Sequence, residues 1–166
     1  GNWRPIDVLL QYQLDFTVEL LESLGYSTQQ IEAVVGDLRA MVEELAALRD
    51  GTFAGATIGG ASVEFWQGWM DLDDARPDEV AALDRPILAL NGGMDWNVPE
   101  DPELSGWAAA LDANAVAGND AVGLPCLTHA FNCVQGETIG ESVDPALFAA
   151  LAEWLGDRGL SEAVRP

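Results

Sequence analysis

From residue 87 to residue 99 the chain reads Ile-Leu-Ala-Leu-Asn-Gly-Gly-Met-Asp-Trp-Asn-Val-Pro. The first four residues form a continuous apolar run of the kind found in a buried parallel strand. Gly92 and Gly93 allow a tight exit from that strand, and Val98-Pro99 fixes the loop beyond Asp95. The stretch therefore predicts a strand whose carboxyl end presents a carboxylate.

A second short strand is predicted at residues 121–124, and His129, the chain's single histidine, follows it. A helix over residues 102–111 joins the two strands, and a last helix covers residues 145–156. This alternation is the pattern of a βαβ crossover in an α/β sheet. Because loops at the carboxyl ends of neighbouring strands share one edge of such a sheet, Asp95 and His129 are expected to meet there.

The first half of the chain predicts an antiparallel helical hairpin. A helix from Pro5 to Leu24 carries apolar residues at three- and four-residue steps, interrupted by a single glutamine, and Gly25 ends it. The second helix opens with a capping box at residues 27–30 and ends at Gly51.

The connection after this hairpin gives weaker signals. Residues 51–60 are rich in Gly, Ala and Thr, and the aromatic stretch 65–69 follows them, so we interpret both as a loop over a surface. Residues 77–83 predict a short helix. We therefore expect two parts: a helical lid or cap hairpin with its following loop at residues 1–76, and an α/β core portion at residues 77–166.

Composition narrows the classes of partner. The 166 residues hold 28 Asp plus Glu against 7 Lys plus Arg, a net charge of −21, and all seven cations are arginine. Such an excess repels phosphate backbones and anionic lipid, so nucleic acid and membrane surfaces are poor partners. The acids are scattered along the chain, which favours adaptation to a salty cytoplasm over an ordinary acidic protein. No apolar run is long enough to span a membrane, and a chain that begins at Gly1 gives no information about a leader.

Two cysteines cannot build a disulfide framework, so nothing in their number indicates an oxidising compartment. Cys126, His129 and Cys133 could in principle supply three ligands to zinc, but a structural site needs a fourth. We favour small packing cysteines, with a disulfide as a minor alternative, and expect no metal and no cofactor. The acidic clusters 71–74 and 100–101 are interpreted as solvated surface rather than a cation site.

Asp95 and His129 together fit the acid and base of a nucleophilic hydrolase, in which a carboxylate holds the imidazole in one tautomer. Each has a structural alternative, since Asp95 could cap the helix after it and His129 could be a satisfied packing residue. Trp96 could line an acyl pocket beside the acid or could pack. We predict Asp95 and His129 as catalytic and Trp96 as substrate-binding.

Residues 92–99 and 125–131 resemble the acid and histidine loops of the α/β-hydrolase superfamily, and the order of acid then histidine agrees with that family. Residues 1–5, the helical hairpin, Trp107 and Trp154 also resemble bacterial and archaeal esterase-like or dienelactone-hydrolase-like members. The resemblance implies an α/β fold class, namely the C-terminal half of an α/β-hydrolase: a helical lid hairpin, two parallel strands and flanking helices.

The serine motif of that family is absent. The nearest string, residues 59–64, has no second glycine where the Gly-x-Ser-x-Gly elbow needs one and follows no predicted strand, so Ser62 is expected to be an ordinary loop serine. The resemblance thus implies the C-terminal part of a serine-dependent carboxylic-ester hydrolase. That part would supply acid and base for a small-molecule ester, and would be inactive without a complementing N-terminal half.

A second hypothesis belongs to another class. The chain could be a non-catalytic acidic module whose helical hairpin and exposed sheet edge bind a partner or a second copy, because two strands bury little surface and leave an edge unpaired. A large separation between Asp95 and His129 would favour this module, whereas proximity would favour the hydrolase.

Overall fold

The computed structural model describes residues 3–136 and 138–159, so Gly1 and Asn2 of the predicted resemblance lie outside the described residues. The chain divides into two compact units, Gly1–Arg76 and Pro77–Pro166. The boundary between the units falls within one helix, which spans Val63–Ala82.

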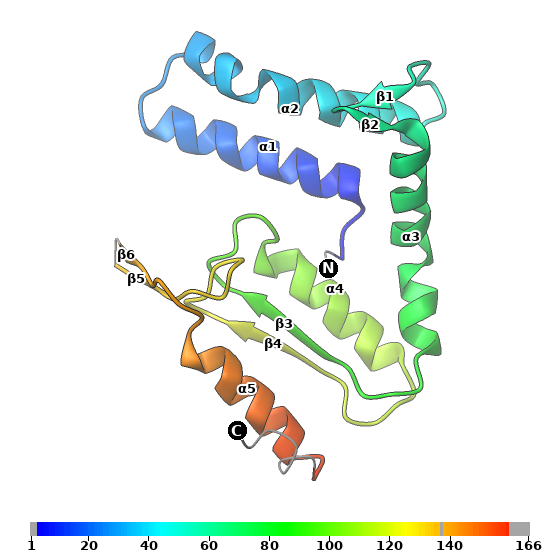
Figure 1. Cartoon of the computed structure of the whole chain (residues 1–166), viewed down its shortest axis with the longest axis vertical. Helices are drawn as coiled ribbons and strands as arrows, with labels where there is room; N and C mark the ends of the chain where they lie inside the picture. The colour runs from blue at the N-terminus through cyan, green and yellow to red at the C-terminus, as the bar shows by residue number, and fades with distance from the viewer. Residues whose placement is uncertain (1–2, 137, 160–166) are drawn as a thin grey trace. The chain divides into compact units, whose positions relative to one another are not determined.

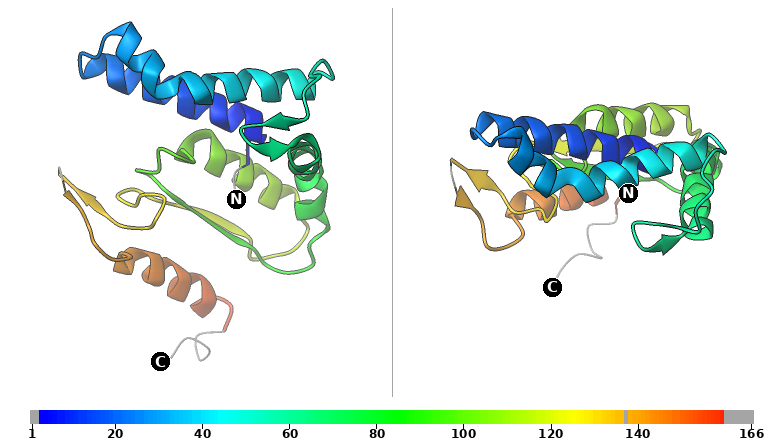
Figure 2. Two further views of the ribbon diagram at one scale, coloured as in Figure 1. Left: turned by 45° about the horizontal axis from the view of Figure 1, so that its top comes forward. Right: turned by 90° about the horizontal axis from the view of Figure 1, so that it is seen from above.

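The first unit opens with the predicted hairpin, and both helices are confirmed. Helix α1 spans Ile6–Ser23 and helix α2 spans Thr28–Arg49. The capping box is present, because the Ser27 side chain accepts from the Gln30 backbone while the Gln30 side chain accepts from the Ser27 backbone. The two helices run side by side in opposite directions in Figures 1 and 2. A core cluster between them consists of Leu14, Ile31, Val35 and Val42.

Beyond the hairpin the prediction of a surface loop is wrong for the aromatic stretch. A two-residue antiparallel hairpin, β1 (Thr57–Ile58) with β2 (Ala61–Ser62), leads directly into helix α3 (Val63–Ala82). Trp66 is buried on α3, and its indole Nε1 donates to the Ile58 carbonyl at 2.9 Å. The second core cluster therefore joins α1, α2, β1 and α3, and it consists of Ile6, Leu45, Ile58, Trp66 and Met70.

A buried carboxylate fastens the start of α1 to α3. Asp73 is fully buried at its side chain, accepts from the Ile6 backbone N–H at 2.6 Å and pairs with Arg76. Arg76 in turn donates to the Trp3 carbonyl at 2.8 Å. Because both charges are paired and hydrogen-bonded, this acid–base pair can be kept inside the unit.

The second unit contains the predicted parallel strands, and their pairing is confirmed. Strand β3 spans Leu88–Gly92 and β4 spans Asp120–Leu124, with Leu88 opposite Asp120 and Gly92 opposite Leu124. Helix α4 (Glu100–Ala113) joins them and packs against both. In Figure 1 the two arrows point the same way, so both strands end at one edge.

The remaining elements of this unit follow β4. A short antiparallel hairpin pairs β5 (Val134–Gln135) with β6 (Thr138–Ile139), and helix α5 (Pro145–Gly156) follows as predicted. The Asp144 side chain caps α5 by accepting from the Ala146 backbone.

The predicted fold class is wrong. Within residues 3–136 and 138–159, β3 and β4 form the one parallel sheet, and each of the other two sheets is an antiparallel pair of two-residue strands. Helices hold most of the described residues, and the expected lid hairpin has core clusters of its own within the first unit. The described chain is a small mixed α/β arrangement, because one βαβ crossover fixes two strands and does not by itself make the wide sheet of half a hydrolase.

None of the helices in the described part of the chain is long and apolar enough to cross a membrane.

Candidate functional site

Asp95 and His129 meet at the carboxyl ends of β3 and β4. Nδ1 of His129 lies 3.0 Å from Oδ2 of Asp95, although the two residues are 34 positions apart. The Asp95 side chain is 7% exposed and the His129 side chain is 60% exposed. A carboxylate can only accept, so this hydrogen bond requires the proton on Nδ1 and leaves Nε2 of the neutral ring as an acceptor.

Backbone groups of the acid loop orient the Asp95 carboxylate. Oδ1 of Asp95 accepts from the backbone N–H groups of Asn97 at 3.0 Å and Val98 at 2.9 Å, so both carboxylate oxygens have partners. Asn91 closes the same loop by donating from Nδ2 to the Val98 carbonyl at 3.0 Å. These bonds use one carboxylate oxygen for the loop itself and leave the other for His129.

Direct contacts join the acid loop to the loop that carries His129. The backbone N–H groups of Gly93 and Met94 donate to the carbonyls of Leu124 and Leu127, both at 2.9 Å. Leu127 is fully buried, and a Cβ on Gly92 would lie 2.7 Å from its carbonyl carbon. Gly92 is therefore needed for the close approach of the two backbones, and its φ is not in the left-handed region.

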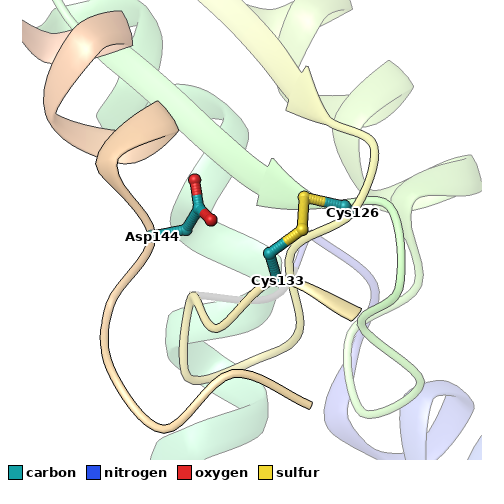
Figure 3. Close-up of side chains that lie close together, drawn as sticks. All are labelled: Cys126, Cys133 and Asp144. Carbon is teal, nitrogen blue, oxygen red and sulfur yellow. A yellow bond between two sulfur atoms is a disulfide. The ribbon is translucent and has the colours of Figure 1, made fainter. Parts of the chain in front are cut away.

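A disulfide closes the loop around His129, which corrects the interpretation of the cysteines as packing residues. Cys126 and Cys133 are bonded, with Cα atoms 4.8 Å apart (Figure 3). The disulfide was the minor alternative among the predictions for these cysteines, and their positions seven residues apart on either side of the histidine are the signal that could have favoured it.

The zinc alternative does not match this arrangement. A disulfide offers no thiolate, and the third ligand-type group near the two sulfurs is Asp144 rather than His129. One Asp144 oxygen already accepts from the Ala146 backbone.

Trp96 lies directly after the acid and is 54% exposed. Met94, on the other side of Asp95, is also exposed. Two large apolar side chains therefore flank a buried carboxylate in one short loop.

Ser62 has a local structural role. Its Oγ accepts from the Phe65 backbone at 3.2 Å at the start of α3, as an N-cap does. Hydrogen bonds from the Glu64 backbone and then from Ser62 lower the pKa of the exposed Glu64 carboxyl. Ser62 belongs to the first unit, whereas Asp95 and His129 belong to the second.

Comparison of the chain with protein-family models, with curated proteins and with solved structures finds no match. An imidazole held by a buried carboxylate is chemically able to accept a proton at Nε2 from a serine, a cysteine or a water molecule.

Proposed function

We propose that Asp95 and His129 are the acid and base of a serine-dependent carboxylic-ester hydrolase whose nucleophile lies outside residues 1–166. The observation that carries this proposal is the 3.0 Å hydrogen bond from Nδ1 of His129 to a buried carboxylate. The burial is asymmetric: the acid is enclosed and doubly held by its own loop, while the ring stays open to solvent. A general base must be accessible to the group whose proton it takes, and the exposed imidazole of His129 meets that requirement.

In the proposed reaction Nε2 of His129 takes the proton of the serine hydroxyl as the oxygen attacks the ester carbonyl. The imidazolium returns that proton to the departing alcohol, which leaves an acyl-serine. Water then repeats the cycle, releasing the carboxylic acid and the free serine. Asp95 keeps the ring in the Nδ1–H tautomer and stabilises the imidazolium.

Ester bonds are favoured among acyl-transfer substrates because the two loops resemble the acid and histidine loops of α/β-hydrolases. That resemblance is now confined to the loops, since the fold class predicted from it is wrong. We assign Trp96 to binding an apolar part of a small ester, because its indole is exposed beside Asp95.

The test is an esterase assay with p-nitrophenyl butyrate on two proteins: residues 1–166 alone, and the same chain joined to the polypeptide encoded directly upstream. We expect background rates for the first, because the nucleophile is absent, and hydrolysis by the second. His129→Ala in the joined protein should lower kcat by at least about 10³-fold.

Asp95→Asn should also reduce the rate, because the amide favours the wrong tautomer. Asp112→Asn is the matched control: it makes the same change at an exposed carboxylate on α4. An active joined protein that keeps its rate in His129→Ala, or an inactive joined protein that is folded, would contradict the proposal.

A second candidate is an interaction module, and one observation favours it. In the described residues β3 and β4 pair only with each other, so neither outer edge of this sheet has a strand partner there. If a second copy pairs with this sheet, light scattering on the chain should give the molar mass of a dimer. A monomer at high micromolar concentration would argue against self-association.

We propose that this protein works at high salt concentration. A net charge of −21 is best tolerated where salt screens it. The cytoplasm remains the proposed compartment if the Cys126–Cys133 bond is redox-active there. A permanent disulfide would instead favour an oxidising compartment.

A further inference from the structure

The loop that carries His129 is a small closed hairpin. Leu127 bridges to Cys133, and the Val134 backbone N–H donates to the Cys126 carbonyl at 2.8 Å. At the tip, Thr128 donates to the Asn132 carbonyl and Phe131 to the Thr128 carbonyl, both at 2.9 Å. The disulfide joins the two arms at the base of this hairpin, and His129 lies near its tip.

The two arms are anchored unequally. The outgoing arm holds Leu127, which is fully buried and bonded to the acid loop through Met94. The returning arm leads into β5 and β6, where residues 135, 138 and 139 are exposed. The disulfide is the covalent link by which the returning arm shares the fixed position of the outgoing one.

The tip of the hairpin needs this support. Phe131 has φ of 58°, a left-handed conformation that is unfavourable for a residue with a side chain. His129 and Ala130 are exposed, so water competes for the hydrogen bonds of this turn. The hydrogen bond from Nδ1 of His129 to Asp95 is therefore made from an exposed turn that contains an unfavourable backbone conformation.

We propose that the Cys126–Cys133 disulfide is the positioning element of His129: it holds the hairpin in the conformation that keeps Nδ1 on Asp95, and its reduction releases the ring. This assignment deepens the proposed hydrolase function and rests on it for its catalytic meaning. The two cysteines act through His129 and have no contact with substrate in the proposed reaction.

Reduction supplies the simplest test. A dithiol such as dithiothreitol gives two electrons and two protons to the disulfide, producing two thiols and a cyclic oxidised reagent. Because the chain has one histidine, a long-range ¹H–¹⁵N spectrum of the imidazole contains a single set of ring signals. This spectrum reports which nitrogen carries the proton, and it does not depend on activity.

In the oxidised protein we expect the Nδ1–H tautomer to dominate. In the reduced protein, and in the Cys126→Ser/Cys133→Ser double variant, the signals should shift toward the Nε2–H tautomer that free histidine prefers. Asp95→Asn is the positive control for lost pairing. Asp112→Asn should leave the spectrum of the oxidised protein unchanged.

Two results would overturn the positioning role of the disulfide. An unchanged Nδ1–H tautomer after reduction would overturn the proposal. So would global unfolding of both the reduced protein and the double variant, measured by circular dichroism, since the disulfide would then hold the whole unit rather than the histidine loop.

The catalytic consequence is measured separately. In the joined protein, reduction should lower kcat by about 10²-fold with a much smaller change in KM, as for a misplaced catalytic group. A tautomer change without any esterase activity would leave the positioning role intact and would refute the hydrolase.

Discussion

Gly92 lies against the backbone of Leu127 so closely that a Cβ on Gly92 would be 2.7 Å from the Leu127 carbonyl carbon and would overlap the oxygen. At this contact the backbone of the acid loop packs directly against the backbone of the loop that carries His129. A side chain larger than hydrogen at position 92 must push the two loops apart.

Gly92→Ala should therefore lower the free energy of unfolding by about 1–3 kcal/mol, the usual cost of overpacking. It should also shift the His129 imidazole toward the Nε2–H tautomer, because Leu127 lies two positions before the histidine. Urea denaturation and the imidazole spectrum would measure the two effects.

Gly156→Ala is the matched control, because it makes the same change in the same unit on α5 with no atom within 4 Å of the new Cβ. It should be neutral or stabilising by up to about 1 kcal/mol. Equal effects of the two variants would show that the Gly92 contact is not the cause.

Replacing the buried Asp73 should greatly lower the free energy of unfolding of the first unit. Asp73→Ala leaves the Arg76 guanidinium and the Ile6 backbone N–H without their buried partner, at an expected cost of about 3–5 kcal/mol. Asp74→Ala removes the exposed neighbour of Asp73, which lies 3.3 Å from Arg49, and should cost at most about 1 kcal/mol. Chemical denaturation followed by circular dichroism distinguishes them, and similar losses would count against the buried pairing.

The disulfide also predicts a stability difference of its own. Closing residues 126–133 removes conformational freedom from the unfolded chain, which for a loop of about eight residues is about 2.5 kcal/mol in the chain-entropy description. The Cys126→Ser/Cys133→Ser double variant should lose about this amount in urea denaturation. No loss at all would indicate that the bond does not form in solution.

Salt should stabilise this protein. With a net charge of −21, raising NaCl from about 0.1 M to about 1 M shortens the screening length from about 10 Å to about 3 Å and weakens self-repulsion. We expect Tm to rise over this range at neutral pH. The rise should shrink near pH 4, where many carboxylates are protonated; a Tm that falls with salt at neutral pH would refute the argument.

Local signals in the sequence predicted the elements that local chemistry determines. Ser27 and Gln30 cap each other within one turn, so the start of α2 could be read directly from four residues. The apolar run at residues 87–90 and the crossover to residues 121–124 likewise predicted a parallel pair. Asp95 and His129 follow these two strands, and their proximity is a consequence of that pairing.

What the sequence did not reveal depends on contacts between distant residues. Gly68 and three aromatic residues made positions 65–69 unlike a helix, yet Trp66 and Met70, four positions apart, bury against Ile6 and Ile58. Tertiary packing therefore makes this segment helical despite its low intrinsic helix propensity. Helix α3 even continues through Pro77, which lacks an N–H to donate. The number of strands beside β3 and β4 could not be deduced from one crossover.

The parallel pairing of Leu90 with Val122 has a further consequence for any variant of this chain. Sliding β4 by one residue along β3 would carry His129 about 3.3 Å, a displacement greater than the length of its bond to Asp95, and would turn the faces of the strand over. The register of the two short strands thus sets the distance between His129 and Asp95. An insertion or deletion inside residues 120–124 should abolish the acid–base pair even where every residue of both loops is retained.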